Sequence, residues 1–202
     1  MGVGGLAVII LFQQEIRKFL LLLGRTPVFS EGSVLQSIRF WATAHAATRT
    51  EITPIVEAAK TLGGTNTGAL MVFSKSSELK FYADSGDRLD AVLSKRLILS
   101  IFNKYSPLHD GAVIIKEGRI VAARCILPVT ERDDIPANFG LRHRAAIGMS
   151  EVTDVFIIIV SEETGQISTV RNGKISANQS TKELRAAIND YLLEEKPNQP
   201  AS

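Results

Sequence analysis

The sequence predicts an α/β fold with a mixed parallel and antiparallel central sheet and helices on both faces. Residues 155–159 read Val-Phe-Ile-Ile-Ile, and a short, continuous apolar run of this kind is typical of a buried central strand. Two further runs, at 112–115 and 120–127, flank the tight turn Glu117-Gly118 and predict an antiparallel hairpin. Segments with apolar residues at helical spacing occur between such strands, so we expect one mixed-sheet domain covered by helices.

The elements follow from the spacing of apolar residues and from turn signals. Thr53 is expected to cap a helix, with Pro54 in its first turn and Gly63-Gly64 at its end. The other expected helices cover 6–23, 33–47, 89–102, 142–149 and 181–192. The expected strands cover 68–73, 79–82, 112–115, 120–127, 154–160, 167–170 and 174–175, with a polar loop at 131–138.

The first stretch of the chain is apolar but interrupted. Charged residues between Glu15 and Lys18 keep residues 6–23 below the roughly 18 continuous apolar residues of a membrane-spanning helix. A basic region and a cleavage site typical of a signal peptide are also lacking. Three interpretations stay open: a helix packed on the domain, a helix at a membrane surface, or the end of a longer chain cut after a membrane span. We expect residues 1–27 to form this helix and a linker, 28–195 to form the domain, and 196–202 to form a disordered tail.

Composition excludes several classes of protein. The 202 residues carry 23 basic and 21 acidic side chains, a net charge of +2, which gives no basis for a general nucleic-acid-binding surface. The single Cys125 excludes an internal disulfide and a cysteine-based zinc cluster, and its apolar neighbours indicate a core thiol. The chain lacks the glycine-rich phosphate loops of the P-loop and Rossmann enzymes, and the motifs of serine hydrolases and zinc proteases. A bound nucleotide would need another architecture.

The first candidate site is the group His109-Asp110-Gly111-Ala112, which lies in a turn directly before a predicted strand. An Asp and a His side by side at a strand end can serve as a base and a metal ligand. Gly111 would leave room for a ligand to approach the backbone. The alternative is structural, because Asp before Gly is a common turn pair and His109 is compatible with a surface position.

The second candidate is Arg142-His143-Arg144, at the start of a predicted helix. Guanidinium groups offer planar forks of donors that match phosphate oxygens. Basic residues at a helix N-terminus oppose the helix dipole unless an anion binds there, so a phosphate explains the triplet better than solvent does.

A third group, Ser161-Glu162-Glu163, follows the central strand. Ligands bind at strand ends in α/β folds, so these carboxylates could hold a metal or a ribose. They could equally be solvated turn residues.

Three motifs in this order and spacing resemble the signatures of the diadenylate cyclase domain, and match its membrane-associated CdaA type best. They occupy residues 108–115 (Leu-His-Asp-Gly-Ala-Val-Ile-Ile), 142–148 (Arg-His-Arg-Ala-Ala-Ile-Gly) and 160–165 (Val-Ser-Glu-Glu-Thr-Gly). The resemblance covers residues 52–193. It implies that two ATP molecules condense to cyclic di-AMP and two pyrophosphates, with two domains face to face because each holds one ATP. It therefore implies a homodimer.

The resemblance also implies a role for each matching residue. Asp110 would activate the 3′-hydroxyl, and His109 with Glu163 would bind a divalent metal, Mn²⁺ or Mg²⁺. The implied nucleotide-binding residues are Gly111, Ala112, Leu127, Leu141, Arg142, His143, Arg144, Ser161 and Glu162. Two positions depart from the common pattern: Leu141 stands where many relatives have Thr, and Ile126 where some have an aromatic that stacks on adenine. These departures motivate a rival interpretation, a nucleotide-binding sensor domain without catalysis.

Relatives of the CdaA type carry transmembrane helices ahead of the domain. Residues 6–23 look like the helix that follows those spans, so the chain resembles a soluble truncation. The resemblance implies a native protein on the cytoplasmic face of a bacterial membrane, with a regulatory protein as a partner.

Overall fold

The computed structural model describes residues 51–75, 79–136 and 139–193. The chain divides into residues 1–48 and 49–202, and all described residues lie in the second unit. The helices expected at 6–23 and 33–47, the boundary expected at residue 27 and the tail at 196–202 lie outside the described residues. Within the described ranges, none of the helices has the length and apolar character needed to cross a membrane.

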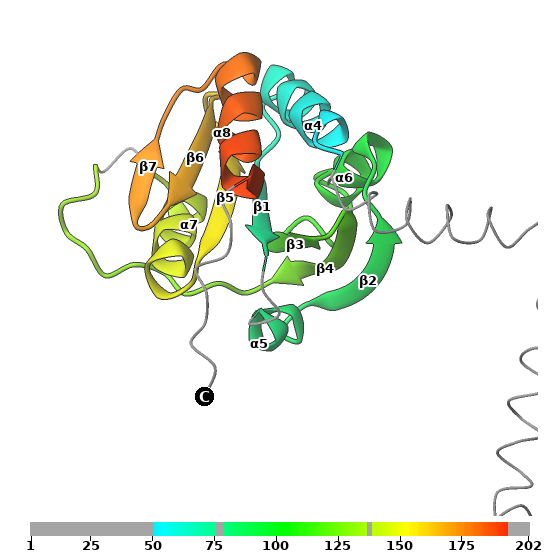
Figure 1. The fold of residues 1–202 in the computed structure, drawn as a ribbon, viewed down its shortest axis with the longest axis horizontal. Coiled ribbons are helices and arrows are strands. Elements are labelled where there is room, and N and C mark those ends of the chain that lie inside the picture. The colour runs from blue at the N-terminus through cyan, green and yellow to red at the C-terminus, as the bar shows by residue number, and fades with distance from the viewer. Residues whose placement is uncertain (1–50, 76–78, 137–138, 194–202) are drawn as a thin grey trace, which may run out of the picture. The chain divides into compact units, whose positions relative to one another are not determined.

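A mixed seven-stranded sheet forms the centre of the described part of the chain, in the order β2-β4-β3-β1-β5-β6-β7 (Figure 1). Strands β1 and β3 are parallel, and every other neighbouring pair is antiparallel. The predicted mixed sheet is therefore confirmed. The strands are β1 (Ala69–Ser74), β2 (Asp87–Val92), β3 (Ala112–Lys116), β4 (Arg119–Cys125), β5 (Val155–Val160), β6 (Ile167–Arg171) and β7 (Lys174–Ser176).

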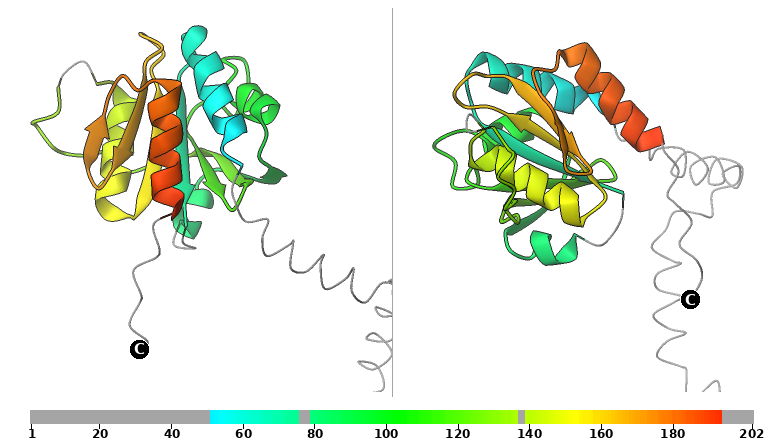
Figure 2. Two further views of the ribbon diagram at one scale, coloured as in Figure 1. Left: turned by 45° about the horizontal axis from the view of Figure 1, so that its top comes forward. Right: turned by 90° about the vertical axis from the view of Figure 1, so that its left-hand side faces the viewer.

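Helices cover both faces of the sheet, as predicted (Figure 2). One face packs against α4 (Thr53–Gly64), α6 (Lys95–Ile101) and α8 (Thr181–Leu193), and the other packs against α5 (Lys80–Ala83) and α7 (Leu141–Val152).

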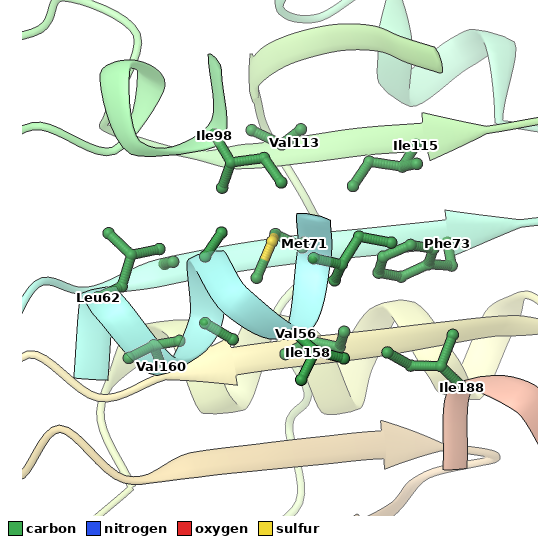
Figure 3. Close-up of a cluster of buried hydrophobic side chains, with 14 of the residues drawn as sticks. Val56, Leu62, Met71, Phe73, Ile98, Val113, Ile115, Ile158, Val160 and Ile188 are labelled. Carbon is green, nitrogen blue, oxygen red and sulfur yellow. The ribbon is translucent and has the colours of Figure 1, made fainter. Parts of the chain in front are cut away.

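Successive side chains of the central strands divide between these two layers, because side chains alternate across a strand. Met71 and Phe73 of β1 join the α4 cluster, whose side chains are drawn in Figure 3, while Leu70 and Val72 join the α7 cluster. All six residues of β1 and of β5 are buried. Full burial of one such side chain contributes about 1.5–3 kcal/mol, so these two strands anchor the sheet.

Two expectations along the chain were wrong. The strand expected at 79–82 is the short helix α5, and the helix expected at 89–102 is the edge strand β2 followed by α6. The apolar positions at 89, 92 and 93 fit a helical spacing, but β2 lies at the edge of the sheet and only Leu89 and Ala91 are partly buried. An edge strand lacks the strong hydrophobic alternation of a half-buried strand. The apolar spacing in this segment therefore predicted a helix instead of a strand. Ser94 separates the two elements and caps α6 by accepting a hydrogen bond from the Leu97 amide at 3.2 Å.

Thr53 also differs from expectation. The cap position of α4 is Ile52, which makes no side-chain cap bond, and Thr53 is the first helical residue. Its hydroxyl accepts a hydrogen bond from the Arg185 guanidinium at 3.3 Å, so it links α4 to α8 instead. Pro54 lies in the first turn, as predicted.

Candidate active site

The sheet topology brings the predicted motifs to the same end of the three central strands. Strands β1 and β3 are parallel and begin there, whereas β5 runs antiparallel to β1, pairs Val160 with Ala69, and therefore ends there. The turn before β3 and the turn after β5 consequently flank the same opening, and the first turn of α7 completes it. A cavity of about 660 Å³ lies at this end, lined by Leu70, Asp110, Gly111, Cys125, Ile126, Leu127, Val129, Gly140, Leu141, Arg142, His143, Ala145, Val160, Ser161, Glu162 and Glu163.

Most of the predicted site residues therefore share one cavity. Ala112, Arg144 and His109 do not line it. Ala112 is fully buried in β3 and contributes to the core behind the cavity. His109 lines a second cavity of about 580 Å³, which shares Arg142 and Glu162 with the first.

Asp110 is exposed and lines the first cavity, and its position is fixed by the backbone that follows it. Gly111 has a φ of +136°, which strongly favours glycine. A Cβ at this position would lie 2.7 Å from the carbonyl carbon of Arg124 in β4. The neighbouring strand therefore occupies the space on the Cβ side of Gly111, while the glycine backbone itself lines the first cavity. The predicted approach of a ligand to this backbone stays a prediction.

His109 is oriented by its own turn. Its Nδ1 lies 2.6 Å from the Ser106 carbonyl oxygen, which can only accept, so Nδ1 carries the proton and donates. The other ring nitrogen, Nε2, then keeps its lone pair in the neutral ring. A backbone carbonyl that fixes one imidazole nitrogen in this way is a common support for a histidine that binds a metal.

Arg142 forms an ion pair with Glu162 and packs against Gly68. Its Nη1 lies 2.6 Å from Oε2 of Glu162, with 25% of the Arg142 side chain exposed. Gly68, directly before β1, lies against this pair: a Cβ there would be 2.6 Å from Arg142 Nη1 and 3.0 Å from Glu162 Oε2. Sequence reasoning placed Gly68 at the start of a strand and assigned it no role. A glycine at a strand end was the available signal, since such residues often mark a close approach by another group.

His143 is buried in the cavity wall and stacks on Phe139, with ring centroids 4.8 Å apart. Burial lowers the pKa of His143 below its ordinary value, and the nearby Glu163 carboxylate opposes this only in part. The imidazole is therefore neutral at pH 7, and the positive charge of the triplet comes from Arg142 and Arg144. Within the described ranges, the half-buried Arg144 side chain makes no hydrogen bond or ion pair.

Ser161 organises the turn after β5. Its hydroxyl oxygen accepts hydrogen bonds from the amides of Glu163 at 3.3 Å and Thr164 at 3.2 Å. These bonds fix the backbone that carries Glu162 and Glu163, both exposed. The hydroxyl hydrogen of Ser161 remains able to donate to a ligand in the cavity.

One wall of the first cavity is apolar. Ile126, Val129 and Leu141 line it and are 71%, 51% and 78% exposed, which is high for large apolar side chains. Leu127 and Cys125 lie buried beside them. Burial, with a smaller contribution from Asp87, raises the pKa of the Cys125 thiol to about 11, so it is a core thiol and not a nucleophile, as expected. The cavity therefore combines an apolar wall with the charged side chains of Arg142, Glu162 and Glu163.

The donor set for a metal is small. Among the described residues, His, Cys, Asp and Glu side chains form no group of three or more able to hold an ion. His109 Nε2 and the Glu163 carboxylate would be two protein ligands. They line neighbouring cavities, His109 the second and Glu163 the first. Mg²⁺ commonly binds through one or two protein carboxylates together with substrate phosphates and water, so a small protein donor set is compatible with a metal that arrives with a nucleotide.

Comparison with known proteins decides the family. The sequence pattern of the DAC family, described as the nucleotide-binding domain of the DisA bacterial checkpoint controller, matches residues 56–175. The chain belongs to this diadenylate cyclase family. The matched residues run from within α4 into β7 and contain all three motifs of the site.

Curated relatives of this cyclase domain cover most of the chain. It is 40% identical to cyclic di-AMP synthase CdaA of Bacillus subtilis over 92% of its own length, and 36% identical to a diadenylate cyclase of Listeria monocytogenes over 94%. It spans only 65% and 67% of the length of those two proteins.

Solved structures of similar fold support the same family. A double cysteine mutant of DacA from Staphylococcus aureus is similar with a TM-score of 0.69 and 37% identity, over 71% of this chain and 95% of that one. A protein of Bacillus cereus described as a hypothetical membrane spanning protein is similar with a TM-score of 0.63 and 34% identity, over 85% and 80%.

Proposed function

We propose that this diadenylate cyclase domain condenses two ATP molecules into cyclic di-AMP and two pyrophosphates. The observation that carries the proposal is the single cavity in which Asp110 shares walls with Arg142 and with the turn of Glu162 and Glu163. A carboxylate that can accept a proton, in the same cavity as cationic donors for phosphate, suits the attack of a hydroxyl on a phosphorus.

Each nucleotide would bind in one orientation. Adenine lies against the apolar wall of Ile126, Leu127 and Leu141, where ring burial is favourable. The phosphates lie toward the first turn of α7, where free backbone amides, the helix dipole and the Arg142 guanidinium all attract anions. The neutral His143 contributes a hydrogen bond without adding charge.

The reaction would be an in-line substitution at the α-phosphorus. The 3′-oxygen of one ATP forms a bond to the α-phosphorus of the other, and the bond to the bridging oxygen breaks with its electron pair leaving on pyrophosphate. The proton of the 3′-hydroxyl passes to Asp110 or, through it, to water. A carboxylate with an ordinary pKa of about 4 is a weak base, so close positioning and the cationic side chains supply much of the acceleration.

Two domains are needed because the product joins two nucleotides and the described part of one chain forms one such cavity. We therefore propose that two chains meet with these cavities face to face. The exposed Asp110 suits this arrangement, since its carboxylate has to reach a hydroxyl of the nucleotide bound to the partner chain.

A divalent ion, Mn²⁺ or Mg²⁺, would be held by His109 and Glu163 together with phosphate oxygens. When bound, it would neutralise phosphate charge and favour ionisation of the attacking hydroxyl. The fixed tautomer of His109 and the turn held by Ser161 are the chain's contribution to that site.

The test is incubation of the purified chain with ATP and Mn²⁺, and separately with Mg²⁺, followed by chromatography with mass detection. Cyclic di-AMP is expected, and its formation per chain should rise with protein concentration as dimers form. A rate per chain that stays constant down to dilute solution would contradict assembly from separate domains.

A second candidate function is a sensor domain that binds nucleotide without catalysis. The exposed aliphatic side chains of Ile126 and Leu141, in place of an aromatic ring and a hydroxyl, favour it. It predicts ATP binding by calorimetry with no product. Fusion to a dimerising tag separates the two functions, because a cyclase that lacks only its productive dimer would then form cyclic di-AMP.

We further propose that the native protein lies on the cytoplasmic face of the bacterial membrane, where ATP is available, and that it has a regulatory protein partner there. The similarity to a protein described as membrane spanning supports the location. Fractionation of cells that express the full-length protein, followed by protease treatment of sealed vesicles of either orientation, tests it.

A further inference from the structure

The second cavity, of about 580 Å³, is not used by the adenine or the α-phosphate in the function proposed above. It lies where α4 and α6 end, next to the first cavity. Its lining consists of Leu62, Thr65, Asn66, Thr67, Gly68, Leu99, Phe102, Asn103, Lys104, Tyr105, His109, Arg142 and Glu162. Arg142 and Glu162 line both cavities, so this ion pair forms part of the boundary between them.

The charges of this cavity favour an anion. Arg142 and Lys104 contribute two permanent positive charges against one carboxylate, that of Glu162, which is already paired with Arg142. Lys104 is exposed and lies 5.0 Å from the ring centroid of Tyr105; within the described ranges it has no carboxylate partner. Its ammonium therefore remains able to pair with a ligand.

Neutral donors accompany the two cations. The Asn103 side-chain oxygen accepts a hydrogen bond from the Tyr105 amide at 3.0 Å, which leaves the Asn103 amide hydrogens for another acceptor. The Thr67 hydroxyl lies 2.9 Å from the Thr65 hydroxyl at the same wall. Cations with surrounding N–H and O–H donors match the many oxygens of a polyphosphate better than they match a base.

The two cavities also differ in their apolar surface. The first has the exposed aliphatic wall of Ile126, Val129 and Leu141, and in the second the strongly exposed large apolar side chain is Tyr105. A nucleoside is therefore drawn to the first cavity, and a charged tail to the second. Arg142, at the boundary, can contact both parts of one ATP.

We infer that the second cavity binds the β- and γ-phosphates of ATP and holds them as pyrophosphate after the bond to the α-phosphorus breaks, with Lys104 as the residue specific to that subsite. The inference rests on the proposed function for the source of the pyrophosphate. Negative charge grows on the leaving group during the reaction, so cations placed there stabilise the transition state. The same cations slow release of the product.

The test compares three probes on the purified chain: pyrophosphate, ATP with Mg²⁺, and AMP, each by isothermal titration calorimetry. AMP carries the base and the α-phosphate but lacks the phosphates assigned to the second cavity. Lys104→Ala is expected to weaken pyrophosphate and ATP binding by about three- to tenfold, the range for loss of one partly exposed charge contact, and to leave AMP binding unchanged. Inhibition of cyclic di-AMP synthesis by added pyrophosphate should weaken by the same factor.

Lys60→Ala is the matched control, because Lys60 is an exposed lysine of α4 that lines neither cavity. It should change none of the three affinities. Equal weakening of AMP and pyrophosphate by Lys104→Ala, an equal effect of Lys60→Ala, or no pyrophosphate binding by the unmodified chain would each overturn the inference. Formation of cyclic di-AMP with unchanged pyrophosphate affinity in Lys104→Ala would reject the subsite and leave the cyclase intact. Expected affinities without any cyclic di-AMP, including after fusion of the chain to a dimerising tag, would support the subsite and reject the cyclase.

Discussion

The two halves of the candidate site are held in place in different ways. The His109-Asp110-Gly111 turn is fixed by main-chain contacts: Gly111 lies against the backbone of β4, and the His109 ring is bound to the Ser106 carbonyl. At the start of α7, the Arg142 side chain is instead held by the carboxylate of Glu162, which lies in a turn 20 residues further along the chain. It has room there because Gly68 carries no side chain.

This difference separates residues that would take part in the reaction from residues that only position them. In the first half, the backbone determines where Asp110 lies, so its carboxylate can be changed without disturbing neighbours. In the second half, the position of the guanidinium depends on other side chains, so changes at residues that do not touch substrate should still alter the reaction. The following variants test each side of that comparison.

Asp110→Asn should have the largest effect. The substitution preserves size and removes the ionised group, so cyclic di-AMP formation should fall by about 10²–10⁴-fold, the usual contribution of a general base. ATP affinity and the unfolding midpoint should stay unchanged, because Asp110 is exposed and its backbone is held independently. Normal turnover in this variant would remove Asp110 from the catalytic role.

Gly111→Ala tests the backbone half of the comparison. It should destabilise the domain by about 2–4 kcal/mol, since the new Cβ meets strand backbone that cannot move independently and the φ of +136° disfavours any side chain. Gly118→Ala is the matched control: it also has a positive φ, +73°, but has open space around it, so strain alone should cost about 1–2 kcal/mol. Urea unfolding measures both. Equal costs would show that the contact with β4 contributes nothing.

Gly68→Ala tests the side-chain half. The atoms that its Cβ would meet are the ends of the Arg142 and Glu162 side chains, which can swing away at little cost to folding. We expect cyclic di-AMP formation to fall about tenfold, as for loss of one charge-assisted contact, with an unchanged melting temperature. Gly64→Ala, where nothing lies within 4 Å, should leave activity unchanged.

A double-mutant cycle sharpens this prediction. If Gly68 acts through Arg142, adding Gly68→Ala to Arg142→Ala should cause no further loss, because the group that it displaces is already gone. Independent, additive losses would mean that Gly68 affects the site by another route.

The sequence predicted those parts of the molecule that local residue patterns determine. Strand β5 was expected because a run such as 155–160 can only be buried, and the mixed sheet followed from hairpins beside helices. The edge strand β2 was missed because its exposed residues carry no burial pattern. Thr53 was misassigned because α4 begins one residue earlier than the capping pattern predicted, and its hydroxyl bonds to Arg185 of α8 instead of to the helix amides.

The candidate site follows the same division. Asp110, Arg142 and Glu162 could be proposed from their chemistry, and the structure places them around one cavity. What sequence could not supply was their mutual placement: the ion pair of Arg142 with Glu162, the closeness of Gly68, and the burial that keeps His143 neutral. Each depends on segments that are distant in the chain and meet only when the sheet forms.

His143 gives the smallest effect. Its folded-state pKa is lowered by burial, so around pH 6 the unfolded chain binds more protons at this residue than the folded one does. The contribution of His143 to the free energy of unfolding should therefore be fully present above its unfolded-state pKa of about 6.5. It should decrease as the pH falls toward the folded-state pKa, by at most about 1.4 kcal/mol per pH unit for one proton. Urea unfolding between pH 7.5 and 5.5 measures this slope, and His143→Gln should reduce it. An unchanged slope in that variant would mean that His143 takes up a proton as easily in its buried stack on Phe139 as in the unfolded chain, and that the α7 half of the site is no drier than the exposed Asp110 turn.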